Sequence, residues 1–163
     1  MIDSNIPLIY THDDFVEGIK TIVKAVKASN FKPDYIVGIA RGGAIPAVYL
    51  SHALKLPLRI VEWSSTHDNA LGDRVSDAII AEDIADGLRV LVVDDIVDGG
   101  DTIRELLNDW GTDSLYTESN PQGKVAITAM FYNPSQETPV AFYDRIIDRA
   151  QDPRWVIFDW EAI

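Results

Sequence analysis

The sequence lacks cysteine altogether: none occurs among its 163 residues. A disulfide framework and a metal site built from thiolates are therefore excluded. The sequence also has no apolar run close to the roughly 20 residues of a transmembrane helix, and residues 1–14 lack the basic and then apolar order of a secretion signal. These absences suit the reducing cytoplasm, so we expect a cytoplasmic protein with no membrane partner.

Positive charge is scarce as well. The chain has 14 lysines and arginines against 26 aspartates and glutamates, which gives a formal net charge of -12. Nonspecific binding to nucleic acid or to an anionic membrane needs clustered basic side chains that neutralise phosphates. We therefore expect no nucleic-acid partner, and we favour small ligands or ligands that carry a metal ion.

Two common nucleotide motifs are missing. A triphosphate P-loop, GxxxxGK[ST], requires a lysine, and no lysine occurs between Lys55 and Lys124. No GxGxxG follows a predicted strand, so a Rossmann dinucleotide site is poorly supported. Internal repeats, low-complexity tracts and linkers are absent too, and the length fits a single domain over residues 1–163.

Alternating helices and strands are what the sequence does contain. Apolar residues at helical spacing predict helices, and short runs rich in β-branched residues predict buried strands. The expected helices cover residues 11–30, 45–54 and 101–110, and the expected strands cover 35–40, 58–63, 89–96, 124–132, 139–147 and 155–160. This order predicts an α/β fold, with a doubly wound, mainly parallel sheet and helices on both of its faces.

Ligands of such sheets bind beyond the carboxyl ends of the strands. Three chemically distinctive segments are expected there: residues 40–43, 94–102 and 132–134. In the second segment, residues 99–102 form a glycine-rich turn that enters a helix. The N–H groups of this turn, the positive end of the helix and the Thr102 hydroxyl can hold an anion. The turn therefore predicts a site for a monoester phosphate.

Three carboxylates precede or begin this turn. Asp94 and Asp95 follow four consecutive apolar residues, and Asp98 stands directly before the glycines. Paired carboxylates can accept hydrogen bonds from a vicinal diol, or hold Mg²⁺ directly or through its waters. The alternative is that one of the pair caps the following turn and that Asp98 caps the helix. A ribose 5-phosphate would satisfy the carboxylates and the phosphate turn together.

The stretch VLVVDDIVDGGDT (90–102) resembles the phosphoribosyl pyrophosphate signature of the type I phosphoribosyltransferases. Within that family it is most similar to the short bacterial xanthine–guanine and hypoxanthine enzymes. The resemblance implies that Asp94 and Asp95 bind the ribose hydroxyls and a metal ion, and that Asp98 faces the purine N7 as general base or hydrogen-bond acceptor. The 5′-phosphate would then be held by Gly99, Gly100, Asp101 and Thr102.

Two further segments extend this resemblance. GIARGGAIPA (38–47) is similar to the family's pyrophosphate loop, and the residues that would hold the diphosphate are Ala40, Arg41, Gly42 and Gly43. An ordinary strand-to-helix turn is the alternative for the glycine pair. WVIFDWE (155–161) is similar to the base-binding segment, in which Trp155 would stack on the base while Val156 and Ile157 offer main-chain contacts. The alternative is that the tryptophans are core residues, which we favour for Trp160.

A flexible hood over the carboxyl edge of the sheet is also implied by the resemblance. It would comprise residues from about 64 to 88, and we interpret His67 within it as a surface residue. The hood would exclude water from the site, because hydrolysis of the sugar donor is the obvious side reaction.

The reaction implied by the resemblance is displacement of pyrophosphate from phosphoribosyl pyrophosphate by guanine, xanthine or hypoxanthine, with Mg²⁺ as cofactor, in purine salvage. Members of the family are commonly dimers or tetramers, so we expect a homo-oligomer. Three departures stand out: Asn133 replaces a usual lysine and leaves base choice open, Asp101 puts an acid in the phosphate turn, and Gly99 replaces a hydroxyl residue. Two alternatives remain: a regulatory protein that senses phosphoribosyl pyrophosphate or a nucleotide, and a transferase for another base, such as orotate.

Overall fold

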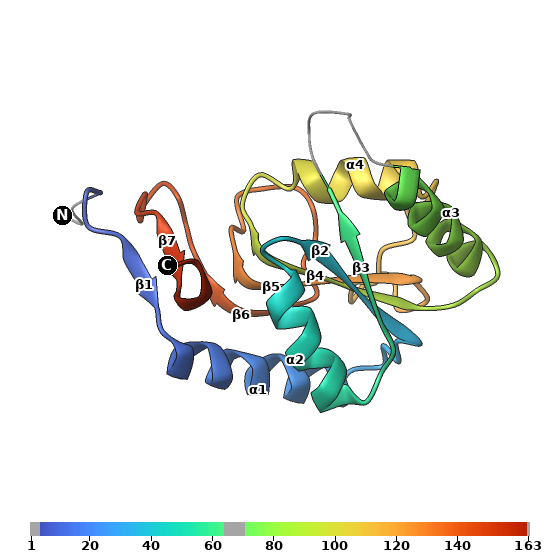
Figure 1. The fold of residues 1–163 in the computed structure, drawn as a ribbon, viewed down its shortest axis with the longest axis horizontal. Coiled ribbons are helices and arrows are strands. Elements are labelled where there is room, and N and C mark those ends of the chain that lie inside the picture. The colour runs from blue at the N-terminus through green and yellow to red at the C-terminus, as the bar shows by residue number, and fades with distance from the viewer. Residues whose placement is uncertain (1–3, 64–70, 163) are drawn as a thin grey trace.

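Five parallel strands form the central sheet of the protein, as the computed structural model in Figure 1 shows for residues 4–63 and 71–162. Their order across the sheet is β3-β2-β4-β5-β6. The strands are β2 (Tyr35–Ala40), β3 (Leu58–Glu62), β4 (Val90–Val97), β5 (Val125–Tyr132) and β6 (Phe142–Ile146). All neighbouring pairs are parallel, so the predicted parallel sheet is confirmed.

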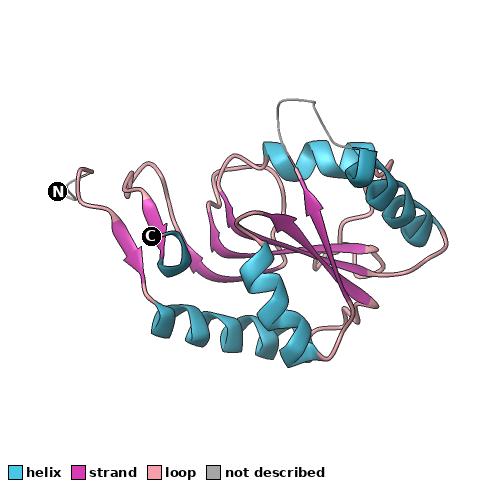
Figure 2. Cartoon of the chain, in the orientation of Figure 1, coloured by secondary structure: helices cyan, strands magenta, loops and turns pink. Residues whose placement is uncertain are grey.

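Helices cover both faces of this sheet, in agreement with the doubly wound prediction (Figure 2). One face packs against α1 (His12–Ala28) and α2 (Ala44–Leu54), and the other against α3 (Leu71–Ala85) and α4 (Asp101–Asp109). The strands are almost continuously apolar because both of their faces are buried. Among the described residues, no helix is both long and apolar enough to cross a membrane.

The first helix begins where its sequence pattern predicts. Thr11 is the N-cap: its hydroxyl accepts a hydrogen bond from the Asp14 N–H, and the Asp14 carboxylate accepts one from the Thr11 N–H in return. One side of the helix, with Phe15, Ile19 and Ile22, is buried against the sheet. Local capping and helical spacing therefore suffice to define this element.

The carboxyl-terminal segment differs from the prediction. Residues 155–160 were expected as a strand, but only Val156–Phe158 form one (β7), and a 3₁₀ turn, η1 (Asp159–Glu161), follows it. β7 pairs with an unpredicted strand, β1 (Leu8–Tyr10), and not with the main sheet. Strands of three residues carry too little alternation for sequence reasoning to detect. Their position is fixed by tertiary packing, since Tyr10 packs edge-on against Phe131 of β5 and Phe158 of β7.

The segment expected as a hood is largely a helix. Residues 64–70, which include His67, lie outside the described part of the chain, but residues 71–85 form α3. Ile80 and Ile84 of this helix are buried in the core between the sheet and α4. Residues 71–85 of the expected hood are therefore helical, and the flexibility of the segment stays a prediction. The apolar residues of this helix are not confined to one side, since Val75 and Ile79 are exposed, and this concealed the helical period.

The register of the central strands opens a crevice at the sheet's edge. β4 pairs with β2 only as far as Gly38 and Val93, whereas it stays paired with β5 as far as Val97 and Tyr132. The strand order also reverses between β2 and β4, because β3 lies outside β2 while β5 lies on the other side of β4. Such switch points are where ligands bind in open α/β sheets. The loops that follow β2 and β4 flank this crevice.

Candidate functional site

The loop after β2 is held tightly against the end of β4 by two glycines. A Cβ atom at Gly42 would lie 2.2 Å from Oδ2 of Asp95, and one at Gly43 would lie 2.2 Å from the Val93 carbonyl oxygen. Contacts this close to a carboxylate and to a backbone carbonyl exclude any other residue type. The glycine pair therefore does more than make a turn: it lets the loop lie across the end of β4.

The polar groups of this loop face the same edge of the sheet. The Gly43 N–H donates to the Ile39 carbonyl, whereas the Gly42 N–H has no partner among the described residues. The Arg41 side chain is exposed, and Ala40, which ends β2, is partly exposed. The peptide bond between Ala40 and Arg41 is cis. This loop can thus offer a backbone donor and a guanidinium to an anion.

Asp94 and Asp95 lie in the second half of β4, beyond the residues that pair with β2. The Asp94 Oδ1 atom accepts a hydrogen bond of 3.0 Å from the Asp95 N–H, and Asp95 Oδ1 accepts one of 2.7 Å from the Ile96 N–H. Burial raises the pKa of Asp94 well above its ordinary value, and the neighbouring charge of Asp95 raises it further. Burial raises the pKa of Asp95 too. A diol or a cation would relieve this crowding of negative charge.

The turn after β4 leads into α4 without a side-chain cap. Gly100 is the N-cap residue, with a φ of 75° that favours glycine, and no side chain accepts hydrogen bonds from the first turn of the helix. The residues of this turn line a polar cavity of about 200 Å³, together with residues 94, 96–98 and 103. Unsatisfied amides at a helix start form a ready anion site. The predicted phosphate turn has the form expected of one.

Asp101, the acid within this turn, is accounted for by its neighbour Arg104. The two side chains form an ion pair one helical turn apart, and the Asp101 side chain is 77% exposed. Arg104 also donates to the Gly99 carbonyl oxygen. Arg104 therefore balances the charge of the Asp101 carboxylate and links it to the Gly99 carbonyl oxygen, which stabilises the turn.

Asp98 is held on both of its oxygens. Oδ1 accepts a hydrogen bond of 2.9 Å from the Asn133 side-chain amide, and Oδ2 forms an ion pair of 2.7 Å with Nε of Arg149. Asn133 is only 8% exposed, and its own amide oxygen accepts from the Ser135 N–H. Asn133 therefore contacts Asp98 but is not among the residues that line the cavity described next.

A second cavity, of about 260 Å³, lies between Asp98 and the carboxyl-terminal segment. Its walls are Asp95, Ile96, Asp98, Arg149, Trp155, Val156, Phe158 and Glu161. Trp155 is 72% exposed, so it is not a core residue, whereas Trp160 packs against the core and stacks on Phe158. Ile157 lies on the face of β7 opposite to Val156 and Phe158, so only its main chain could reach this cavity.

The structure thus brings the predicted residues of three separate segments to one edge of the sheet. The loop after β2 contacts Asp95, the phosphate turn shares a cavity with Asp94, and Asp98 faces the cavity beside Trp155. Sequence reasoning missed Arg149 and Glu161, because a lone arginine in a loop and an acid near the chain end carry no pattern. It also missed Gln136 and Thr138, whose side chains pack against Gly100.

Comparison with known proteins finds a matching family and several similar proteins. A family model described as "Phosphoribosyl transferase domain" matches residues 8–162. A xanthine-guanine phosphoribosyltransferase of Cereibacter sphaeroides is 31% identical over 130 residues, which cover 77% of this chain and 68% of that protein.

Solved structures of similar fold include a purine phosphoribosyltransferase from Pyrococcus horikoshii, with a TM-score of 0.66 and 22% identity, over 96% of this chain and 95% of that one. Another is the xanthine-guanine-hypoxanthine phosphoribosyltransferase of Helicobacter pylori, with a TM-score of 0.67 and 20% identity, over the same shares of the two chains. At these identities the structures support the fold alone.

The crowded carboxylates predict a specific dependence of stability on pH. A carboxyl group whose pKa is raised by folding favours the folded state below its ordinary pKa of about 4, and this contribution is lost as pH rises through the folded value. Asp94→Asn, which cannot ionise, should therefore be more stable than the wild type near neutral pH, and the difference should shrink toward about pH 4. Urea unfolding across this range, with EDTA present, measures the effect.

The matched control is Glu118→Gln, which neutralises an exposed carboxylate far from the crevice. Its unfolding free energy should follow the wild type at every pH. A constant difference between Asp94→Asn and the wild type across the pH range would contradict the assigned burial of Asp94.

Proposed function

The chain belongs to the phosphoribosyltransferase family, and we propose that it transfers the 5-phosphoribosyl group from phosphoribosyl pyrophosphate to a purine base in purine salvage. The observation that carries this proposal is the meeting of three subsites at one switch point: uncapped helix amides, a carboxylate pair and a cavity with an aromatic wall. Phosphate, sugar and base of one nucleotide need these three in this order.

Each part of the substrates has a proposed place. The 5′-phosphate binds the amides of residues 99–102, and the ribose hydroxyls donate to Asp94 and Asp95. The diphosphate lies along residues 40–43, where the Gly42 N–H and the Arg41 guanidinium supply donors. The purine stacks on Trp155, and the main chain at Val156 and Ile157 contacts its edge. The exposed indole of Trp155 beside the cavity supports this placement.

Mg²⁺ is the proposed cofactor, and the donor set fits it. Asp94 and Asp95 are adjacent hard oxygen donors, and they could hold the ion directly or through its waters. No group of three or more acidic or histidine side chains suited to a metal occurs in the described part of the chain. Mg²⁺ is commonly held by one or two carboxylates together with substrate oxygens and water. When bound, the ion would neutralise the diphosphate and act as a Lewis acid.

The chain's own residues have defined tasks in the reaction. The bond between ribose C1 and the diphosphate oxygen breaks while a bond from C1 to purine N9 forms, and the proton on N7 passes to the Asp98 carboxylate. Arg41 and the Gly42 N–H stabilise the negative charge that builds on the leaving diphosphate. Asp94 and Asp95 orient the sugar and stabilise the positive charge that develops on its ring.

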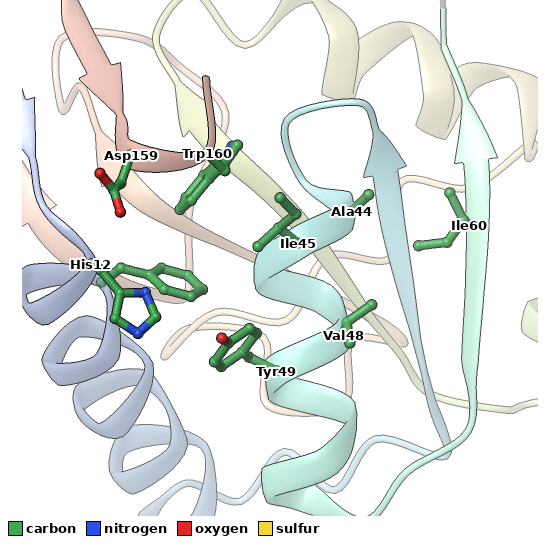
Figure 3. Close-up of a pocket in the computed structure, with 9 residues that line it drawn as sticks. His12, Ala44, Ile45, Val48, Tyr49, Ile60, Asp159 and Trp160 are labelled. Atoms are coloured by element: carbon green, nitrogen blue, oxygen red, sulfur yellow. The ribbon is translucent and has the colours of Figure 1, made fainter. Parts of the chain in front are cut away.

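A homo-oligomer is supported by a groove on the outer side of α2. Figure 3 shows Val48 on the side of α2 that faces Ile60 of the edge strand β3, and Tyr49 on the side that faces His12 of α1. The groove has a volume of about 480 Å³ and is mostly apolar, and each of Val48, Tyr49 and Ile60 is 41% exposed. A second copy of the chain is the proposed occupant. The absence of cysteine and the acidic charge support a cytoplasmic enzyme without a nucleic-acid partner.

A panel of bases provides the test of the proposed reaction. Purified protein with Mg²⁺ and phosphoribosyl pyrophosphate should convert guanine, xanthine or hypoxanthine to its monophosphate and release pyrophosphate, as chromatography of the products would show. EDTA should abolish turnover, and added Mg²⁺ should restore it. Intact donor binding without turnover on any purine or pyrimidine would favour a sensor of phosphoribosyl pyrophosphate, and turnover of orotate alone would reassign the base.

The oligomer proposal makes a prediction about mass in solution. Size-exclusion chromatography with light scattering should give the wild type a mass that is a multiple of the 18.1 kDa chain mass. Val48→Asp should lower this mass toward that of the monomer, because the substitution places a charge in the groove. Val75→Asp, at a more exposed valine on α3, is the control and should keep the wild-type mass. A monomeric wild type, or an unchanged mass for Val48→Asp, would refute the interface.

A further inference from the structure

The wall of the base cavity holds a hydrogen-bond acceptor and a donor side by side. Asp98 and Arg149 both line the cavity, and they are joined through Asp98 Oδ2 and Arg149 Nε at 2.7 Å. A second guanidinium nitrogen, Nη1, donates to the Arg154 carbonyl oxygen at 2.6 Å. The third, Nη2, has no partner among the described residues, and the planar fork places it on the same edge as Nε.

Arg149 is anchored well enough to act as a fixed donor. Its side chain is largely buried, and it is tied at one nitrogen to a carboxylate and at another to a backbone carbonyl. Such a guanidinium loses little further freedom when it donates a hydrogen bond through its remaining nitrogen. The free nitrogen is thus presented beside Asp98 in a set direction.

Asn133 is a poorer candidate for this donor, because it is 8% exposed and is not among the residues that line the cavity. Its amide nitrogen donates to Asp98 Oδ1 and its amide oxygen accepts from the Ser135 N–H. Asn133 and Arg149 together grip the two oxygens of Asp98, so the carboxylate is held from both sides. Asn133 therefore acts on the base through Asp98.

An acceptor beside a donor complements one particular edge of a purine. In the tautomer that attacks through N9, the N7–H group is a donor, and in a 6-oxopurine the neighbouring O6 atom is an acceptor. Asp98 matches N7–H, and Arg149 Nη2 matches O6. A 6-aminopurine would turn an N–H donor toward the guanidinium, which has no acceptor to offer.

We propose that Arg149 determines the specificity of this enzyme for 6-oxopurines, by donating through Nη2 to O6 while its Nε holds Asp98 beside N7. Asn133 is a positioning residue that acts through Asp98. This inference rests on the proposed function, since it assumes that the base lies in the cavity beside Trp155.

The test uses nucleotide binding, which does not require turnover. Isothermal titration of the wild type should give tighter binding of inosine 5′-monophosphate than of purine riboside 5′-monophosphate, which lacks O6, by roughly 10- to 100-fold, the worth of a hydrogen bond to a charged donor. In Arg149→Met this ratio should fall steeply, and any preference that remains comes from the N1–H group, which purine riboside also lacks. Arg149→Lys should keep part of it, because an ammonium can donate to O6 but cannot also hold Asp98 in the same geometry.

Arg154→Met is the matched control. It removes an equal charge from the same loop, from a side chain paired with Asp152, and it leaves the carbonyl that anchors Arg149 in place. Its preference for the inosine nucleotide should match the wild type. Asn133→Ala should keep the preference too. It should lower kcat for hypoxanthine and change KM little, because only the hydrogen bond that positions Asp98 is lost.

The possible failures are distinguishable. An unchanged ratio in Arg149→Met, or a wild type that binds both nucleotides equally, would overturn the assignment of Arg149, whatever the turnover. If Arg149→Met does not fold, Arg149→Lys decides the matter, and a ratio equal to that of the wild type together with unchanged kcat would overturn the assignment. A preference for the inosine nucleotide that depends on Arg149, without turnover on any base, would support the assignment and refute the transferase reaction.

Discussion

The site depends on one constraint: the pairing of β4 with β2 ends at Val93. Up to that residue the two strands are hydrogen-bonded neighbours, and beyond it β4 continues alongside β5 only. The β2 loop can lie across the gap because Gly42 and Gly43 bring backbone to within contact of Asp95 and the Val93 carbonyl. Without this close approach, the loop after β2 and the carboxylate pair would lie too far apart to bind one ligand together.

The groups that can bind an anion and the carboxylates lie in separate parts of this site. The phosphate turn offers uncapped amides, and its single acid, Asp101, is paired with Arg104. The remaining carboxylates are the ones proposed to face the sugar and the base. Burial raises the pKa of Asp94 and Asp95, and the charge of Asp95 raises that of Asp94 further, so the pair lowers the stability of the folded state near neutral pH. An acidic protein can thus bind anionic ligands through backbone groups.

Local patterns in the sequence predict the parts of the fold that are locally determined. The capping box at Thr11 and the apolar runs of β2, β4 and β5 are enough to give α1, the parallel sheet and the edge at which ligands bind. The pairing of β1 with β7 could not be predicted, because it depends on packing around Tyr10 between segments at opposite ends of the chain. The buried isoleucines of α3 were likewise concealed in a polar stretch.

In the candidate site, too, residues in local motifs could be predicted, whereas residues brought in by tertiary contacts could not. Asp94, Asp95, Asp98 and the glycine turns lie in continuous motifs, so their places could be predicted. Arg149 reaches Asp98 across 51 positions of sequence, and Asn133 reaches it across 35, so neither contact has a local signature. The sequence showed that Asn133 departs from the family pattern, but it could not show that the asparagine supports Asp98 while an arginine from a distant loop faces the cavity.

The most direct measurement of the central claim is a crystal structure with bound guanosine 5′-monophosphate. The phosphate should accept hydrogen bonds from the amides of residues 99–102. The ribose hydroxyls should donate to Asp94 and Asp95, and the guanine should stack on Trp155. Its N7 and O6 edge should face Asp98 and Arg149. A nucleotide bound in the groove beside α2, or one whose base points away from Trp155, would contradict the account.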